Sequence, residues 1–423
     1  MSKSIFAFLL SMLLFVVATD AQKIITTTTP EAAGFSADRV KRIDNNMKAW
    51  VDQGWINGAA ALIIRNGKVA YYKSFGYNDL ATKAPLAKDG IFRIASQTKA
   101  ITSVSVMMLY EEGKFLLDDP ISKFIPSFAK ATVLDKFNEK DSSYTSMPAK
   151  RDITVRDLLT HTSGLGYAQI GSKEATAIYY KNKITAGLDV HDGTLLAAMT
   201  RLGKLPLMHN PGEKWTYGLN TDLLGCLVEI WSGMSLDEFF RTRIFTPLGM
   251  NDTYFNVPAE KASRLVNFFE ADSLGKLHKQ TNAFGSLNMN YPLHKKTYFS
   301  GGGGLSSTMF DYAIFLQMLL NDGKYNGQQL LSRNSVRMMT MNQIGDLNLG
   351  DEKFGLGFSI ATLKSSSILP NREGTFGWGG AFSTTYWVDP VEKLVVVMYR
   401  QMWGTHSEID QLFRVSVYQA IGD

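Results

Sequence analysis

The sequence predicts an α+β fold, in which an antiparallel sheet built from both chain ends is flanked by helices and carries an inserted all-helical lobe. Three observations lead to this prediction. Strand-like runs with turn signals lie near both ends of the chain, at 58–77 and 384–400. Between about 100 and 290 the patterns are mostly helical. A chain of 423 residues with 45% hydrophobic content can also bury a substantial core.

A largely apolar run near the N-terminus is typical of a secretory signal. Lys3 precedes this run, which extends from Ile5 to Val17 and is too short to span a bilayer comfortably. Small residues follow it, in Thr19-Asp20-Ala21. We therefore expect cleavage of residues 1–21, export to the periplasm or the medium, and no stable membrane insertion afterwards. An uncleaved anchor or a first core helix is the alternative.

The elements at the chain ends follow from local signals. Ser36 is a candidate N-cap for a helix with Val40, Ile43, Met47 and Val51 on one face. Asn66-Gly67 lies between two strand-like runs and predicts a hairpin. A second hairpin is expected to turn at Asp389-Pro390, followed by a helix over about 407–421. Within one domain of 22–423, we expect a sheet-containing lobe at about 30–100 and 291–423 and a helical lobe at about 101–290.

Charge and cysteine content exclude several function classes. The 44 Lys+Arg and 39 Asp+Glu give a net charge of +5 without basic blocks, so we expect no nucleic-acid partner. Cys226 is the single cysteine and lies in an apolar helical stretch, which indicates a core residue rather than a catalytic thiol. The six histidines form neither an H-E-x-x-H motif nor a Cys/His cluster. We therefore expect no metal and no cofactor.

The pattern Ser-x-x-Lys occurs three times, at Ser96, Ser127 and Ser273. Serine and lysine at this spacing meet only if both lie on one helix face. Ser273 has Gly275 inside its motif, and Ser127 follows Pro126 in a loop-like segment. Ser96, in contrast, follows a strand-like run and opens a helical one. Ser96 and Lys99 are therefore the candidate pair.

A serine at a helix N-terminus has a chemical advantage. The free N–H groups and the positive end of the helix dipole stabilise a developing oxyanion. The apolar helix would bury Lys99, and desolvation lowers a lysine pKa, which gives a neutral amine able to take the Ser96 proton. The alternative is an N-capping serine beside a surface lysine.

Other serine chemistries have less support in the sequence. The nucleophile elbow G-x-S-x-G is missing from the chain. His161 is the best candidate for a catalytic histidine, but its Thr, Ser and Gly neighbours indicate a structured turn. We interpret His161 as a residue that stabilises this loop.

Segments along nearly all of 30–423 resemble one family, the serine hydrolases built like class C β-lactamases, which include DD-peptidases and family VIII carboxylesterases. The segments follow the order of that family: GAAALIIRNGKVAYYKSFGYND, FRIASQTKAIT, ITVRDLLTHTSGL, NPGEKWTYGLNTDLLG, FTPLGMNDTYF, GGGGLSSTMFDYAIFLQMLLNDG and GWGGAFSTTYWVDP. The resemblance implies a β-lactamase/transpeptidase-like fold and an acyl-enzyme mechanism.

The resemblance also implies roles for individual residues. Ser96 matches the acylated nucleophile, Lys99 its amine partner, and Tyr217 the tyrosine that shuttles the proton to the leaving group. Trp378-Gly379-Gly380 matches the third motif, on a strand that edges the cleft. The backbone N–H of Ala381 would pair with that of Ser96 as the oxyanion hole.

Two departures from the family pattern bear on the substrate. Leu219 stands where the Tyr-x-Asn element has asparagine, and Asn220 is displaced by one position. Trp378 replaces a polar or cationic residue, so both positions would present an apolar wall. Loss of a charge-assisted contact worth ~1.5–3 kcal/mol disfavours anionic substrates by roughly ten- to a hundredfold.

We therefore expect a carboxylesterase that acts on a small-molecule ester or amide, with weak or no β-lactam hydrolysis. A β-lactamase, a D-amino-acid peptidase or an acyltransferase on the same scaffold remains the alternative, and a catalytically inactive envelope binding protein is a further one. The sequence makes no prediction about the oligomeric state.

Overall fold

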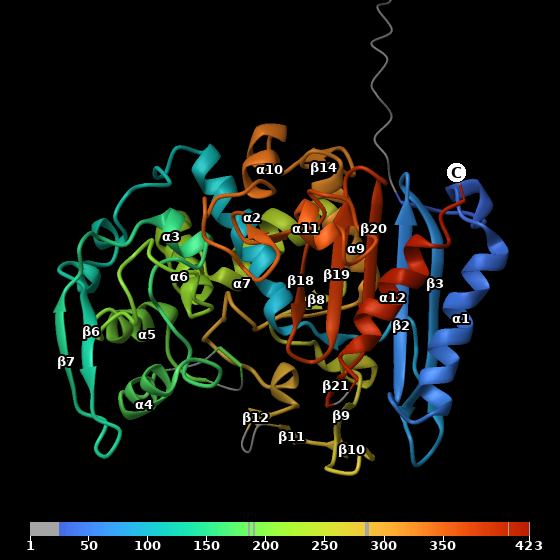
Figure 1. Ribbon diagram of the computed structural model, residues 1–423, viewed down its shortest axis with the longest axis horizontal. Coiled ribbons are helices and arrows are strands. Elements are labelled where there is room, and N and C mark those ends of the chain that lie inside the picture. The colour runs from blue at the N-terminus through green and yellow to red at the C-terminus, as the bar shows by residue number, and fades with distance from the viewer. Residues whose placement is uncertain (1–24, 185–186, 189–190, 284–286, 405, 423) are drawn as a thin grey trace, which may run out of the picture.

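The computed structural model describes residues 25–184, 187–188, 191–283, 287–404 and 406–422 (Figure 1). The expected signal sequence, residues 1–21, lies outside these ranges.

A nine-stranded sheet joins the two ends of the described chain. Its order is β1-β3-β2-β20-β19-β18-β17-β16, with β4 paired to β3. All neighbours are antiparallel except β1 and β3. The strands are β1 (Thr26–Thr27), β2 (Gly58–Arg65), β3 (Lys68–Asp79), β4 (Ala84–Pro85), β16 (Lys353–Phe354), β17 (Ser359–Ile360), β18 (Phe376–Gly380), β19 (Thr384–Asp389) and β20 (Leu394–Tyr399). The predicted sheet from both chain ends is confirmed.

Both predicted hairpins are present. Asn66 and Gly67 have φ angles of 52° and 74° in the turn between β2 and β3, the left-handed conformation that a two-residue hairpin turn needs. Asp389 ends β19 and pairs with Leu394 of β20. The buried Asp389 carboxylate accepts hydrogen bonds from the N–H groups of the turn that follows it.

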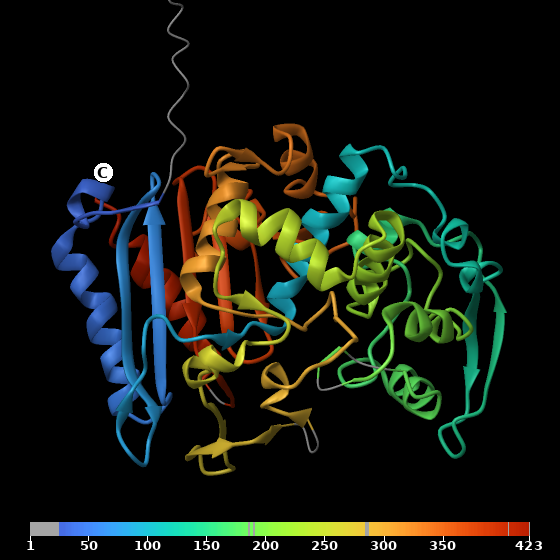
Figure 2. The same ribbon diagram turned by 180° about the vertical axis from the view of Figure 1, so that it is seen from behind.

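The two faces of the sheet are covered by different helices, as Figures 1 and 2 show. On one face, α1 (Ala37–Asp52) and α12 (Glu408–Tyr418) pack on side chains that include Ala61 and Ile63. On the other, α9 (Met309–Leu320) packs on β2 and β20, and Leu62 and Ile64 join the larger core. Successive side chains of a strand point to opposite faces, which explains this alternation.

The first helix begins as predicted. The Ser36 side chain accepts a hydrogen bond from the Arg39 N–H and caps α1. Val40, Ile43 and Met47 are buried, but Trp50 rather than Val51 completes the buried face. Residues 43, 47 and 50 follow one another by four and three positions, so they stay on one side of the helix.

The segment between the sheet halves is mostly helical, but it also contains strands, so the predicted all-helical lobe is corrected in this respect. A hairpin of β6 (Thr132–Phe137) and β7 (Tyr144–Pro148) lies at its outer side (Figure 1). Val133 on β6 bridges to Leu207 and joins the core.

The helices of the segment between the sheet halves are α2 (Thr98–Glu111), α3 (Val155–Leu159), α4 (Lys173–Lys181), α5 (Leu195–Leu202), α6 (Asn220–Ser232), α7 (Leu236–Phe240) and α8 (Thr246–Leu248).

Shorter elements complete the described chain. Two helices follow α9, namely α10 (Arg333–Met339) and α11 (Leu363–Ser366). The remaining strands are β5 (Phe92–Arg93), β8 (Thr253–Tyr254), β9 (Phe268–Ala271), β10 (Leu277–Gln280), β11 (Asn282–Ala283), β12 (Leu287–Asn288), β13 (Ser306–Ser307), β14 (Lys324–Tyr325), β15 (Gln328–Gln329) and β21 (Met402–Trp403). Each helix in the described ranges is too short or too polar to span a bilayer.

Candidate active site

Ser96 lies in a strained turn that leads into α2. The turn Ala95–Gln97 follows β5, and α2 begins directly after it at Thr98. Ala95 has a φ angle of 43°, in the left-handed region that residues with a side chain rarely adopt. Such strain persists where the surrounding structure imposes it, and it often marks a functional site. Ser96 itself is half-buried.

Two side chains converge on the Ser96 hydroxyl. Tyr217 Oη lies 2.7 Å from Ser96 Oγ, within hydrogen-bond distance. Lys99 Nζ lies 3.4 Å from the same oxygen and 4.7 Å from the centre of the Tyr217 ring. The predicted helix spacing therefore does bring Ser96 and Lys99 together, and Tyr217 joins them from the segment before α6.

Lys99 is buried and fully hydrogen-bonded. Besides Ser96 Oγ, its Nζ donates to the Gly302 carbonyl at 2.6 Å and to Tyr167 Oη at 3.0 Å. Three acceptors match the three protons of an ammonium group. Burial by itself lowers the pKa of Lys99, but its electrostatic and hydrogen-bond interactions with Tyr167 and Tyr217 outweigh this effect, so the pKa lies above its ordinary value. The raised pKa favours an ammonium form of Lys99 over the neutral amine that desolvation alone would give.

A buried carboxylate lies behind this ammonium. Asp222 Oδ1 accepts hydrogen bonds from Ser300 Oγ at 2.5 Å and from the Gly302 N–H at 3.0 Å. Burial raises the pKa of Asp222. A Cβ on Gly302 would lie only 3.2 Å from Tyr167 Oη and 3.4 Å from Lys99 Nζ. The small residue lets the backbone approach Lys99 closely.

Sequence reasoning missed Tyr167, Asp222 and Gly302. Their signals were weak, since a tyrosine after a glycine turn and a glycine in a glycine run both have common structural roles. Only the fold brings these three positions to Lys99.

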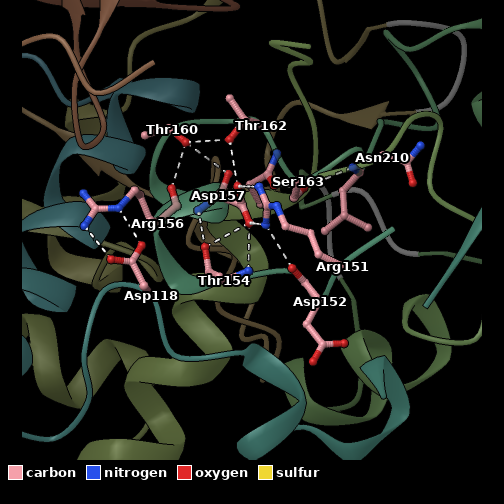
Figure 3. A network of polar contacts seen from close by, with 12 residues as sticks. Asp118, Arg151, Asp152, Thr154, Arg156, Asp157, Thr160, Thr162, Ser163 and Asn210 are labelled. Carbon is pink, nitrogen blue, oxygen red and sulfur yellow. Dashed lines mark hydrogen bonds and ion pairs between the residues drawn. The ribbon is translucent and has the colours of Figure 1, made fainter. Parts of the chain in front are cut away.

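Figure 3 shows the polar network that holds the loop 160–166 in place. The buried Asp157 carboxylate accepts two hydrogen bonds from Arg151, at 2.6 and 2.9 Å. It also accepts one from Thr162 Oγ1 at 3.2 Å and caps α3 together with Thr154. Paired guanidinium and carboxylate groups with two parallel bonds fix geometry well. The loop that precedes Tyr167 is therefore anchored at its start.

His161 supports Tyr217 from behind. Its Nδ1 lies 2.9 Å from Asn220 Nδ2, and its ring centre lies 5.1 Å from that of Tyr217. Asn220 Oδ1 in turn accepts from Ser163 Oγ at 2.5 Å. Burial, with a smaller effect of the Lys99 charge, holds the pKa of His161 well below its usual range. A neutral histidine in this position fits the interpretation as a loop-stabilising residue.

Leu219 does not line the site. Its side chain has no exposed surface and belongs to the main core. Gly218 packs so closely that a Cβ there would lie 2.0 Å from the Leu165 carbonyl oxygen, which fixes the chain where α6 begins. The prediction of an apolar substrate wall at Leu219 is therefore wrong, because the start of α6 turns this side chain into the core.

The third motif does reach Ser96, through the end of β18. Trp378 Nε1 lies 3.4 Å from Tyr217 Oη, and the ring centres are 5.7 Å apart. A Cβ on Gly380 would lie 2.4 Å from the Ile94 carbonyl oxygen, so β18 and the Ser96 turn meet backbone to backbone. Ala381 packs against a small hydrophobic cluster that includes Ala95, and Gly379 is exposed.

Aromatic rings extend from Trp378 along one side of the site. Its ring centre lies 6.3 Å from that of Trp215 and 5.5 Å from that of Phe354. No cluster of three or more His, Cys, Asp and Glu side chains suited to a metal occurs in the described ranges.

A half-buried serine in contact with a tyrosine and a buried ammonium is typical of a serine hydrolase. The β-lactamase family model matches residues 43–415. This chain belongs to the β-lactamase family, and it is a serine hydrolase of that family.

Individual relatives carry different functional assignments. A protein from Escherichia coli K12 assigned as a D-alanyl-D-alanine carboxypeptidase is 28% identical over 89% of this chain and 85% of its own. Esterase EstB of Burkholderia gladioli is also 28% identical, over 88% of this chain and 94% of its own. The structure of EstCE1, a hydrolase with promiscuous acyltransferase activity, has a TM-score of 0.76 and 25% identity, over 90% of this chain and 99% of that one. The β-lactamase/transpeptidase-like fold expected from the resemblance is confirmed.

Proposed function

We propose that this enzyme hydrolyses small carboxylic esters through an acyl intermediate on Ser96. The observation that carries the proposal is the contact of Ser96 Oγ with Tyr217 Oη at 2.7 Å, with Lys99 next to both. This arrangement supplies a nucleophile, a proton acceptor and a fixed positive charge within one hydrogen-bonded group.

The proton is transferred between Ser96 and Tyr217. With the proton retained on Lys99, the Tyr217 oxygen, as phenolate, accepts the Ser96 proton while Ser96 Oγ attacks the ester carbonyl. The Lys99 ammonium stabilises the negative charge on that oxygen. Tyr217 then gives the proton to the departing alkoxide as the ester C–O bond breaks. In the second half, water gives its proton to Tyr217 and attacks the acyl group. The bond between the acyl carbon and Ser96 Oγ then breaks, and Tyr217 returns the proton to Ser96 Oγ.

The backbone is proposed to stabilise the tetrahedral intermediates. The N–H groups of Ser96 and Ala381 would donate to the oxyanion, since the end of β18 lies against the Ser96 turn. Gly380 has no side chain that would separate the end of β18 from the Ile94 carbonyl next to the Ser96 turn.

The ester preference rests on Trp378. An indole in contact with Tyr217 and with the rings of Trp215 and Phe354 makes this side of the site apolar. It offers no positive charge to a substrate carboxylate. EstB and EstCE1 support esterase activity, whereas the E. coli relative supports a carboxypeptidase as the second candidate.

A substrate panel tests the proposal. We expect turnover of p-nitrophenyl butyrate, and little or none of a chromogenic cephalosporin or of a peptide ending in D-Ala-D-Ala. Rapid cephalosporin or peptide turnover without ester turnover would reject the esterase assignment. Adding a primary alcohol and detecting a new ester by mass spectrometry measures whether acyl transfer competes with hydrolysis, as the EstCE1 likeness suggests.

Export is part of the proposal and has its own test. We expect the protein from the periplasm or the medium to begin near residue 22, after removal of 1–21. Mass measurement of the intact purified protein detects this cleavage, and an uncleaved N-terminus on exported protein would argue for an anchor.

A further inference from the structure

The outer face of β18, opposite the Trp378 side chain, carries a groove with a volume of about 210 Å³. Gly377 and Gly379 alternate with Trp378 along the strand, so they form part of its floor. In Figure 1, α12 crosses in front of β20 and the lower part of β19 and stays clear of β18. The groove is smaller than the ~300–1,000 Å³ pockets of drug-sized ligands, so it suits a small molecule.

One wall of this groove carries a positive charge without a hydrogen-bonding partner. The Arg414 guanidinium lies 4.4 Å from the centre of the Trp387 ring. It makes no hydrogen bond or ion pair within the described part of the chain. The acids on neighbouring elements are already engaged, since Asp410 pairs with Arg400 at 2.6 Å and Asp389 accepts from Tyr418 at 2.7 Å. Burial lowers the pKa of Arg414.

A negatively charged side chain, that of Glu352, also lines the groove. Glu352, half-buried next to β16, has a side chain without a hydrogen bond or ion pair among the described residues. It forms no ion pair with Arg414, although both line the same small space. Partly buried charges usually have partners, so two unpaired ones of opposite sign in one groove need an explanation.

We propose that this groove binds a small zwitterion with one carboxylate and one ammonium group, of the size of a free amino acid. The planar guanidinium of Arg414 offers two parallel N–H donors to the carboxylate. Glu352 accepts from the ammonium, and the glycine floor lets the ligand lie close to the backbone. A simple anion would face the charge of Glu352, and a simple cation that of Arg414. The proposal is independent of the proposed function, because it uses none of the residues in contact with Ser96 Oγ.

Calorimetric titration of the full-length protein with glycine and with L-alanine tests this site. We expect saturable binding in the millimolar range or tighter. Propionate and ethylamine, which each carry one of the two charges, should bind at least ~10-fold more weakly, because each loses one charge-assisted contact. Arg414→Gln and Glu352→Gln should each weaken the binding of L-alanine by ~10-fold or more. Arg333→Gln and Glu31→Gln, matched changes at exposed positions elsewhere, should leave it unchanged.

Three results would overturn the proposal. They are the lack of saturable binding of both amino acids, undiminished binding by Arg414→Gln and Glu352→Gln, and binding of propionate as tight as that of L-alanine, which would indicate an anion site. Circular dichroism checks the fold of each variant. If Arg414→Gln does not fold without its contact to Trp387, Glu352→Gln decides, because its side chain makes no described hydrogen bond.

Discussion

The two sides of Ser96 are built differently. On one side, Lys99 is buried and holds three hydrogen bonds that include Tyr167 Oη and the Gly302 carbonyl. On the other, the end of β18 offers its backbone and the half-buried indole of Trp378. The first side is a closed polar network that fixes where protons and charge lie, whereas the second is open to a ligand. This difference teaches that the reaction type and the choice of substrate depend on separate parts of the molecule.

The largest effect on ester hydrolysis is expected at Ser96, which lies between the two sides. Ser96→Ala should reduce p-nitrophenyl butyrate turnover by at least ~10³-fold, because loss of a nucleophile removes covalent catalysis. It should also abolish labelling by a fluorophosphonate probe. Labelling as strong as in the parent protein would show that another residue is the nucleophile. An unchanged melting temperature serves as the folding control.

The closed side is tested by two tyrosines that both lie next to Lys99. Tyr217→Phe should lower kcat by ~10²–10⁴-fold, the usual loss for a proton-transfer group. Tyr167→Phe removes a hydroxyl that contacts Lys99 but does not reach Ser96 Oγ in the structure, so it should cost much less. Equal losses would mean that Tyr217 acts only by holding Lys99. The assay is steady-state ester hydrolysis with both variants side by side.

A substitution at Leu219 tests whether this side chain stabilises the core or binds substrate on the open side of the site. Leu219→Ala should lower the free energy of unfolding by ~2–5 kcal/mol, as for other buried leucines. Its ratio of butyrate to acetate ester hydrolysis should stay near that of the parent, because the side chain has no exposed surface. Urea unfolding and the two ester assays measure both quantities. A changed ratio of butyrate to acetate ester hydrolysis with an unchanged free energy of unfolding would show that Leu219 contacts the substrate after all.

The open side is tested at Trp378. Trp378→Lys introduces a cation beside Tyr217, and a charge-assisted contact should improve kcat/KM for an ester with a free carboxylate by ~10–100-fold relative to a neutral one. Trp378→Phe, which keeps an apolar ring, should leave this ratio unchanged. If Lys and Phe give the same ratio, the indole does not set the preference for neutral substrates.

The smallest effect is expected at His161, which packs near the Tyr217 ring, and it concerns the pH dependence of stability. Burial holds the pKa of His161 well below its usual value of 6.5, so the unfolded chain binds the proton more readily below that pH. Stability from this residue is present above pH 6.5 and is lost as the pH falls, by up to ~1.4 kcal/mol per unit. Thermal unfolding of the parent and of His161→Asn across pH 5–8 measures it. A steeper dependence in the variant would contradict the assignment.

The sequence predicted the parts of the fold that depend on local signals. The Asn66-Gly67 turn, the Ser36 cap and the two hairpins follow from backbone preferences of nearby residues. The β6–β7 hairpin was missed, because β7 is exposed along its whole length and packing therefore imposes no apolar pattern on it.

In the active site too, local sequence signals predicted some contacts, whereas contacts between distant segments were missed. Ser96 and Lys99 lie one helical turn apart, so their proximity could be predicted. The contacts of Asp222 and Gly302 depend on tertiary packing between distant segments and could not. Leu219 was misplaced because motif spacing alone does not show the direction of a side chain at a helix start.

The pairing of β2 with β20 has a consequence for synthesis. Ala60 pairs with Tyr399, so a central strand pair of the sheet waits for nearly the whole chain to emerge from the ribosome. Closing contacts this far apart in sequence is slow, and unpaired strand edges stay open to aggregation meanwhile. Ser96 emerges early, yet β18, the strand that edges its site, is among the last to leave. A prematurely terminated chain would therefore contain the nucleophile without an enzyme around it.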